Sequence, residues 1–263
     1  MKKQIITECK RAFFSTGMVT ALLIGIGIVL WHQYQYVWNV GVEQYNIYCP
    51  ESVFYKWIGA SSFPMQSYLF YLILPILACL PAGTSYYEDL HSGYYIHIYT
   101  RNQKKEYLFA KYTAAFLSGG IAVVLPLVLS LYFTAMRFPM LAPEPIMGFG
   151  PNARSVGAIL YYKHPGLHTL LFLGIDFIFA GGIAGITLLT TFFTNYKFTA
   201  LITPFVCYYF VFSLDNLLGV MNFSPNYFLI PGFFRNTIWE FLIGILILAA
   251  VAVGYYQKGK RLE

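Results

Sequence analysis

Residues 167–192, LHTLLFLGIDFIFAGGIAGITLLTTF, carry a single formal charge, at Asp176. A run of about 20 apolar residues is long enough to cross a bilayer core of roughly 30 Å as a helix. The rest of the 263-residue chain has the same character, because 58% of its residues are hydrophobic and 11% are charged. Soluble domains carry roughly 25% charged residues. These values predict a membrane protein of the all-α class.

Five other segments are similarly apolar, and each is bounded by charged residues, Pro, Gly or Asn. Each is long enough for one membrane-spanning helix, and no linker divides them into separate domains. The chain is therefore predicted to be a single transmembrane domain over residues 1–263. Its six predicted spans are residues 15–36, 65–84, 108–136, 167–192, 198–221 and 236–256.

Two segments outside the spans have patterns of their own. In residues 2–13, apolar side chains recur at helical spacing among charged and polar ones, which predicts an amphipathic elbow helix in the headgroup layer. Residues 222–235, NFSPNYFLIPGFFR, are apolar but interrupted by two prolines. Non-helical backbone survives at membrane depth only where protein or a water-lined cavity covers it. We expect a partly re-entrant hairpin there, before the last span.

The basic residues predict the orientation. An even number of spans places both termini on one side, and Lys and Arg accumulate in cytoplasmic loops. Twelve of the 17 basic residues lie on the terminal side, so the termini are predicted to be cytoplasmic. Because the basic residues lie at span ends and not along a groove-sized face, the predicted partner is the lipid bilayer and not nucleic acid. The twelve are Lys2, Lys3, Lys10, Arg11, Arg101, Lys104, Lys105, Lys111, Lys197, Lys258, Lys260 and Arg261; the five opposite are Lys56, Arg137, Arg154, Lys163 and Arg235.

Charge is concentrated in residues 85–111, SYYEDLHSGYYIHIYTRNQKKEYLFAK, which hold seven of the 28 formal charges. The acidic pair Glu88 and Asp89 precedes Gly93, a helix-stopping residue, and an aromatic stretch follows before a basic entry into the third span. Accumulation of basic residues on the cytoplasmic side explains the Lys and Arg. It does not explain why Tyr94 and Tyr95 lie among charges of both signs. An aromatic core with a charged rim is typical of a protein-binding surface.

The order of these residues resembles the membrane subunit of ABC-2 type ABC exporters. The layout is similar as well: an elbow helix, six spans, an apolar hairpin before the last span and a basic tail, KGKR. Gly93 is followed by Tyr94, where the family pattern often has Gly-Thr, and this is similar to a subset of small Gram-positive permeases, including those near lantibiotic self-protection systems. The residues that carry the resemblance are Glu88 or Asp89, Gly93, Arg101, Tyr107 and Lys111.

The resemblance implies a permease in the plasma membrane of a bacterium, moving a peptide or another amphipathic or lipid-like substrate outward. It also implies a second permease subunit, identical or different, and two copies of a separate ATP-binding subunit that holds ATP and Mg. Residues 85–107 would be the segment that couples the permease to this ATPase. The implied coupling residues are Glu88, Asp89, Gly93, Tyr94, Tyr95, Arg101, Lys104, Lys105, Tyr107 and Lys111.

The chain lacks the motifs of an enzyme. It contains no G-x-x-x-x-G-K-[ST], so ATP must be hydrolysed by another chain, and we expect no cofactor in this one. H-E-x-x-H and G-x-S-x-G are also absent, and Pro165 and Gly166 between His164 and His168 disfavour a metal site. Two alternatives to a permease stay open: an intramembrane enzyme acting on lipid or peptide, and a non-transporting scaffold or sensor subunit.

Polar groups within the predicted spans are candidate functional residues, because an ionisable group in hydrocarbon is costly. Asp176 either lines a translocation pathway or accepts hydrogen bonds from a neighbouring span. Asp215 and Asn216 either line such a pathway or mark an interfacial break. Glu240 is expected to pair with Arg235. The small residues at 181–185 predict close helix packing, within one subunit or between two.

Overall fold

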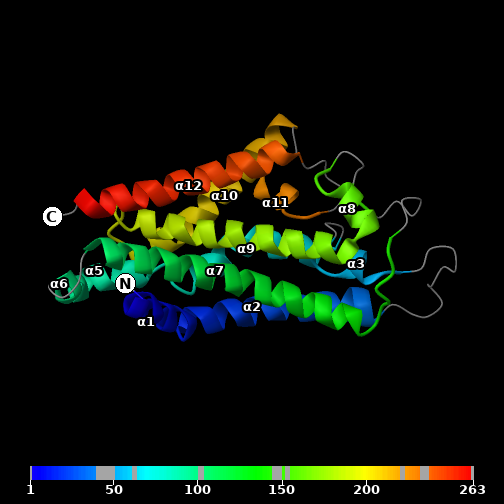
Figure 1. Ribbon diagram of the computed structural model, residues 1–263, viewed down its shortest axis with the longest axis horizontal. Helices are drawn as coiled ribbons and strands as arrows, with labels where there is room; N and C mark the ends of the chain where they lie inside the picture. Colours follow the sequence, from blue (N-terminus) through cyan, green and yellow to red (C-terminus); the bar gives the residue numbers. More distant parts are fainter. Residues whose placement is uncertain are drawn as a thin grey trace.

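The computed structural model describes residues 2–39, 51–60, 64–99, 104–143, 150–151, 155–219, 223–231 and 237–261, apart from the side chains of residues 97–99. Figure 1 shows this part of the chain as an elongated helical bundle, and it contains no strand. Its elements are α1 (Lys2–Phe13), α2 (Thr16–His32), the π-helix η1 (Gln33–Trp38), α3 (Val53–Lys56), α4 (Met65–Cys79), α5 (Ser85–His91), α6 (Tyr94–Tyr99), α7 (Lys104–Ala135), α8 (Ala158–Lys163), α9 (Pro165–Thr190), α10 (Lys197–Leu218), α11 (Pro225–Phe228) and α12 (Ile238–Arg261).

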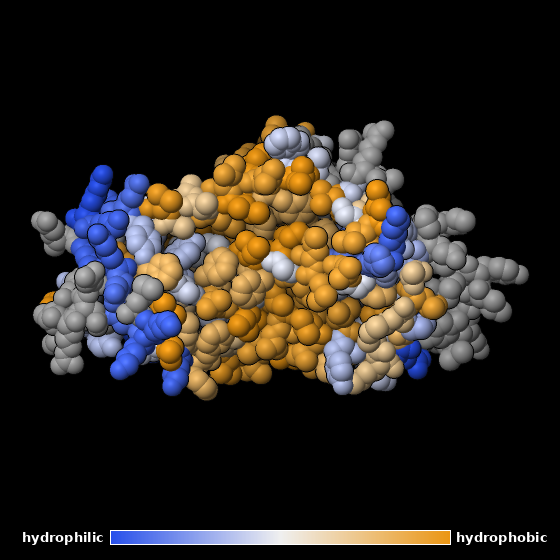
Figure 2. Space-filling model, in the orientation of Figure 1, coloured by the Kyte–Doolittle hydropathy of each residue, from blue (hydrophilic) through white to orange (hydrophobic). Residues whose placement is uncertain are grey.

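Five of these helices are long and apolar enough to cross a membrane: α2 with η1, α7, α9, α10 and α12. They run along the long axis of the bundle, and Figure 2 shows a broad apolar surface across its middle with hydrophilic residues toward the ends. This agrees with an all-helical membrane protein. The five helices correspond to all of the predicted spans except residues 65–84.

The remaining predicted span contains only the 15-residue helix α4. At 1.5 Å per residue, a helix of that length covers about 22 Å, less than the bilayer core. It ends because Pro81 directly follows the C-cap residue Leu80 and cannot continue the helix's hydrogen bonding. Most of its side chains are buried, Phe70, Tyr71 and Leu74 completely. The described structure therefore has five helices of membrane length and one shorter, enclosed helix.

The core lies along α7 and α9, which pack against each other and against most of the other long helices. Small residues permit the close approach of these two helices. A Cβ atom on Gly181 of α9 would lie 2.6 Å from the carbonyl oxygen of Phe116 in α7, and one on Gly119 of α7 would lie 2.8 Å from the Cβ atom of Ala184 in α9. The small residues at 181–185 thus pack within one chain. By contrast, α10 and α12 keep most of their surface exposed.

The first helix, α1, has the bounds predicted for the elbow, residues 2–13. It packs against α7 and buries Glu8 and Ala12, while Ile6 on another side stays exposed. Ser15 separates it from α2 by capping α2: its Oγ accepts a hydrogen bond from the backbone N–H of Met18. The location of α1 in the headgroup layer stays a prediction.

The apolar segment before the last long helix is described over residues 223–231 and contains the short helix α11. The side chains of Tyr227 to Ile230 are buried, and the ring of Phe228 contacts Phe179 of α9 and Phe241 of α12. The described part of this segment thus lies among α9, α10 and α12 (Figure 1). Its depth in a membrane stays a prediction.

Candidate functional site

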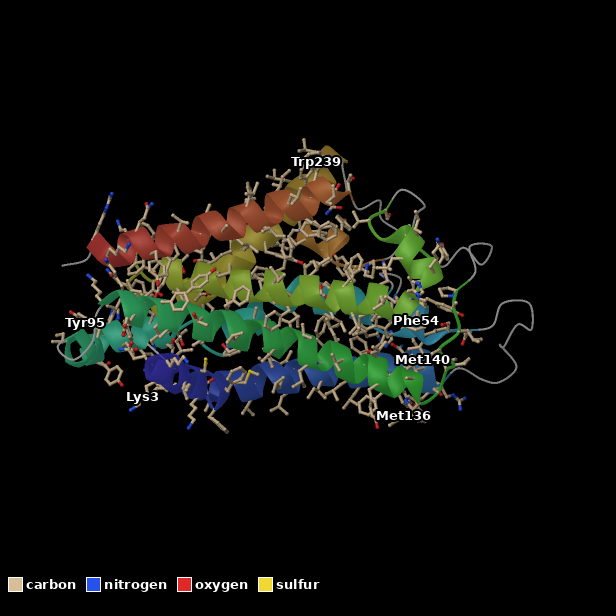
Figure 3. All side chains as sticks on the ribbon, in the orientation of Figure 1. Lys3, Phe54, Tyr95, Met136, Met140 and Trp239 are labelled. Atoms are coloured by element: carbon tan, nitrogen blue, oxygen red, sulfur yellow. The ribbon has the colours of Figure 1, made fainter. Side chains whose placement is uncertain are left out.

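One end of the bundle gathers α1, the last turns of α12, and the helix pair α5–α6, which projects furthest (Figure 1). The stick view places Tyr95 at this projecting tip and Lys3 nearby, with Phe54, Met136 and Met140 at the opposite end (Figure 3). This end holds the described residues among those predicted to couple the permease to an ATPase. Arg101 falls outside the described residues.

The helix pair is formed by a reversal of the chain at Gly93. Helix α5 ends at His91 with Ser92 as its C-cap residue, and Gly93 adopts φ +71°, a left-handed conformation that glycine adopts without steric cost. Its carbonyl oxygen accepts a hydrogen bond from the backbone N–H of Ile96 at the start of α6. The sequence predicted the stop at Gly93, and the aromatic stretch after it is a short helix.

Four charged side chains meet beneath this pair in a cluster that we call the ion cluster: Glu8, Arg11, Asp89 and Lys111. Asp89 of α5 receives two hydrogen bonds from the Arg11 guanidinium, Nη2 to Oδ1 at 2.9 Å and Nη1 to Oδ2 at 3.3 Å. The Lys111 Nζ of α7 lies 2.7 Å from Asp89 Oδ2 and 2.7 Å from Glu8 Oε2. The Tyr107 hydroxyl also donates to Asp89. The cluster thus links α1, α5 and α7.

The ion cluster is almost completely enclosed. Asp89 and Lys111 are each 1% exposed and Glu8 is 6% exposed, while the outer side of Arg11 reaches the surface. Burial opposes ionisation of Asp89, but hydrogen bonding by Arg11 and the charge of Lys111 outweigh it, so the pKa of Asp89 lies below its ordinary value. Two cations and two anions balance formally. A buried charge that loses its partner is costly, so the cluster fixes α5 in one position.

A second, exposed anchor holds the other side of α5. Glu88 forms an ion pair with Lys197, the first residue of α10, at 2.5 Å. The hydroxyl of Tyr87 donates to the backbone carbonyl of Asn195 at 2.6 Å. Neighbouring acidic residues therefore face different helices: Asp89 points into the bundle and Glu88 points toward α10.

Helix α6 offers two exposed apolar side chains among the described residues of the predicted coupling segment. Tyr94 is 41% exposed and Ile96 is 52% exposed. The Arg11 guanidinium lies 5.1 Å from the centroid of the Tyr94 ring, within the range of a cation–π contact. The ion cluster and the exposed helix therefore share Arg11.

The basic stretch after α6 begins α7 beside the end of α12. The Lys105 carbonyl accepts a hydrogen bond from the Tyr256 hydroxyl at 3.3 Å, and Lys104 Nζ lies 3.5 Å from the Lys260 carbonyl. Of the predicted coupling residues, Asp89, Tyr107 and Lys111 are thus buried together, whereas Glu88, Tyr94 and Lys105 face outward. This separates residues that position the segment from residues that a partner could reach.

Sequence reasoning missed Glu8, Arg11 and Lys197 as members of this site. It treated Glu8 and Arg11 as the polar side of an amphipathic helix, and Lys197 as one basic residue among twelve. The opposite charges of Glu8 and Arg11 at i, i+3 are a signal in the sequence, because residues at that spacing share a helix face. Nothing in the local sequence links either of them to Asp89.

The three predicted pathway residues do not meet in one place. Asp176 of α9 is 0% exposed and accepts a hydrogen bond from the Tyr71 hydroxyl of α4 at 3.1 Å. The Tyr208 hydroxyl of α10 donates to the Tyr71 carbonyl at 2.9 Å. Within the described residues, Asp176 Oδ1 has no hydrogen-bond partner. Asp176 is therefore a contact point between α4 and α9 in the described structure.

Asp215 and Asn216 hold the apolar segment around α11. Asp215 Oδ2 accepts a hydrogen bond from the backbone N–H of Ser224 at 2.8 Å, and Asn216 Oδ1 accepts one from the Tyr227 hydroxyl at 2.7 Å. Glu240 accepts a hydrogen bond from the backbone N–H of Thr237 at the start of α12. Arg235, its predicted partner, lies outside the described residues.

A further polar group, unnoticed in the sequence, lies at the opposite end. The Gln33 amide at the start of η1 donates to the Ser130 carbonyl at 3.0 Å and to Thr134 Oγ1 at 2.9 Å in α7. The Gln66 amide of α4 donates to Gln35. These contacts join η1 to α7 and α4, and those of Gln33 are buried. Throughout the described residues, no group of three or more His, Cys, Asp and Glu side chains is arranged to hold a metal ion.

Comparison with known proteins finds no match: no family model, no curated protein and no solved structure.

Proposed function

We propose that this chain is the membrane-spanning permease subunit of an ATP-driven exporter. In this proposal α6 and residues 101–107 bind a separate subunit that hydrolyses ATP. The observation that carries the proposal is the construction of the α5–α6 pair. Its inner side is fixed to α1 and α7 by the buried ion cluster, and its outer side presents Tyr94 and Ile96 beyond the apolar surface. Exposed aromatic and apolar groups within a charged rim suit a protein partner.

The same contacts suggest how a partner would act on the spans. A displacement of α6 would be passed to α5 across Gly93, because α5 and α6 are contiguous. From α5 it would reach α1 and α7 through Asp89, and α10 through Glu88. Packed helices respond to such a displacement as rigid bodies, since their interdigitated side chains permit discrete rearrangements more readily than continuous deformation. The helix pair would thus act on α1 and on two long helices, α7 and α10, together.

The remaining parts of the proposal rest on the resemblance to ABC-2 type exporters. Two permease subunits, identical or different, would pair above two ATP-binding subunits that hold ATP and Mg, with the termini in the cytoplasm of a bacterium. The substrate would be a peptide or another amphipathic or lipid-like molecule, moved outward across the plasma membrane. Asp176, Asp215 and Asn216 stay candidate residues of the route.

The test is co-purification of this chain with the ATP-binding protein encoded beside its gene, followed by an ATPase assay in lipid nanodiscs. Ile96→Asp introduces a charge into the proposed docking surface, and Ile159→Asp introduces the same charge on α8 at the opposite end, where Ile159 is 74% exposed. We expect Ile96→Asp to abolish stimulation of the ATPase and Ile159→Asp to retain it. Arg101→Glu, and replacement of Gly93 by a bulky residue, should also abolish stimulation.

Equal loss with both isoleucine variants, or unchanged ATPase activity with Ile96→Asp and Arg101→Glu, would overturn the docking proposal. A folded protein that binds no ATPase would favour the alternatives, an intramembrane enzyme or a scaffold. Asp176 would then be the first residue to substitute.

A further inference from the structure

A pocket with a volume of about 350 Å³ opens between α1–α2, the turn at residues 80–84 and the start of α10. This volume falls in the range of small-molecule sites, about 300–1,000 Å³. Helices α2 and α10 form opposite sides and both pack against α4, whose C-terminal turn closes the pocket between them. The helices approach the turn closely, since a Cβ atom on Gly17 would collide with the carbonyl oxygen of Leu80.

The pocket is lined by two pairs of oppositely charged side chains, one pair on each of two sides. Glu8 and Arg11 of α1 lie on one side, 3.3 Å apart, and Glu88 of α5 and Lys197 of α10 lie on the other. Arg11 and Lys197 retain 39% and 55% side-chain exposure, so both can bind a further group. An anionic ligand would be attracted by Arg11 and Lys197 but repelled by the carboxylates beside them, and a cationic ligand would meet the reverse. A ligand that carries both signs can match the whole lining.

The remainder of the lining is apolar or weakly polar and leads into the membrane-length helices. Thr20 of α2 and Leu201 of α10 line the pocket about one turn further along their helices than the first residues, Thr16 and Lys197. Beyond them α2 exposes apolar side chains such as Leu23, which is 67% exposed. Figure 2 shows hydrophilic residues at this end of the bundle next to its apolar middle. The pocket therefore lies where a charged head group with an attached hydrocarbon chain would lie in a bilayer.

We propose that this pocket binds the zwitterionic head group of a phospholipid. The phosphate lies toward Arg11 and Lys197, because phosphate oxygens accept charge-assisted hydrogen bonds from guanidinium and ammonium groups. The ammonium group lies toward Glu88, whose side chain is 50% exposed, because the Glu8 carboxylate is enclosed and paired with Arg11 and Lys111. Because Glu88 belongs to α5, the bound lipid fills the space between α5 and α2. This inference does not depend on the proposed exporter function.

The experiment uses the purified full-length chain in detergent, without any ATPase, and measures lipid retention by native mass spectrometry. The probes are phosphatidylethanolamine, phosphatidylglycerol and diacylglycerol with identical acyl chains. Phosphatidylethanolamine should be retained best, phosphatidylglycerol more weakly because it lacks the ammonium group, and diacylglycerol least. Lys197→Met should weaken retention of phosphatidylethanolamine about tenfold, as expected for loss of one charge-assisted hydrogen bond.

Lys10→Met is the matched control, because Lys10 is exposed on α1 at the same end but does not line the pocket. It should leave retention unchanged. Thr20→Trp provides a second variant that fills the pocket from an exposed position and should also displace the lipid. Equal retention of phosphatidylethanolamine and phosphatidylglycerol, or equal effects of Lys197→Met and Lys10→Met, would overturn the proposal.

Discussion

Asp89 and Asp176 are withdrawn from solvent to the same degree, at 1% and 0% exposure, yet their partners differ in kind. Asp89 lies at the charged end, within reach of two cations and a tyrosine hydroxyl. Asp176 lies halfway along α9, and the hydrogen bond that the described structure gives it comes from one tyrosine. Burial alone therefore does not define the role of a carboxyl group. The first fixes helices through charge, and the second joins two helices through a single neutral donor.

The largest effect is expected from Lys111→Met. The substitution retains much of the aliphatic volume but leaves Arg11 as the only cation of the ion cluster, facing both Glu8 and Asp89. Removal of one partner from a buried ion pair costs about 3–5 kcal/mol. We expect a loss of this order in the free energy of unfolding, measured by thermal or denaturant unfolding of the detergent-solubilised protein. A loss under about 1 kcal/mol, the range of an exposed ion pair, would show that the ion cluster is solvated.

The pH dependence of the free energy of unfolding tests whether Asp89 stabilises the fold as an ionised carboxylate. Its pKa is lower in the folded protein than in the unfolded chain, where Asp has a pKa of about 3.9. The stabilisation is thus fully present above pH 3.9 and is lost as the pH falls through the lower, folded-state value. Unfolding curves of the wild type and Asp89→Asn should differ most above pH 3.9 and converge below it. A difference that grows on acidification would contradict the direction of the shift.

Composition and apolar run length were sufficient to predict the helical class and the location of the long helices, because each property is local to its segment. The length of α4 was not predictable in this way. Residues 65–84 are mostly apolar, and a proline in this segment does not by itself mark a helix end, since Pro75 lies inside α4. The helix ends at Cys79, and the turn after it packs between α2 and α9. A short helix is tolerated because neighbouring helices enclose it, which depends on tertiary packing.

The same limit applies to the candidate site. Charge density and the stop at Gly93 indicated a site in residues 85–111, and the structure places residues 85–99 and 104–111 at one end of the bundle. The sequence could not show which acidic residue is buried and which is exposed, since Glu88 and Asp89 are neighbours and both carry a carboxylate. Their different partners, Lys197 and Arg11, come from distant parts of the chain.

Tyr71→Phe should have an intermediate effect. It removes the hydroxyl that donates to Asp176 Oδ2 and leaves a buried carboxyl group without that bond. An unsatisfied buried polar group costs about 1–3 kcal/mol, so we expect a loss of this order in the free energy of unfolding. Tyr208→Phe is the comparison variant, because it removes a hydroxyl that donates to the Tyr71 backbone carbonyl in the same core. Phe70→Leu is unsuitable for comparison because it creates a cavity. A loss of the same order is expected for Tyr208→Phe, because Pro75, four residues after Tyr71 in α4, has no N–H to donate to that carbonyl oxygen.

The smallest effect is expected at the exposed pair, Glu88 and Lys197. Their side chains are 50% and 55% exposed, and exposed ion pairs contribute about 0–1 kcal/mol to the free energy of unfolding. Glu88→Gln should therefore leave the unfolding curve nearly unchanged, while Asp89→Asn, one residue further along, should shift it strongly. Because both variants replace a carboxylate by an amide on the same short helix, the contrast isolates the effect of the partners. Equal shifts would mean that α5 is held from both sides alike, and the distinction between a buried anchor and an exposed one would fail.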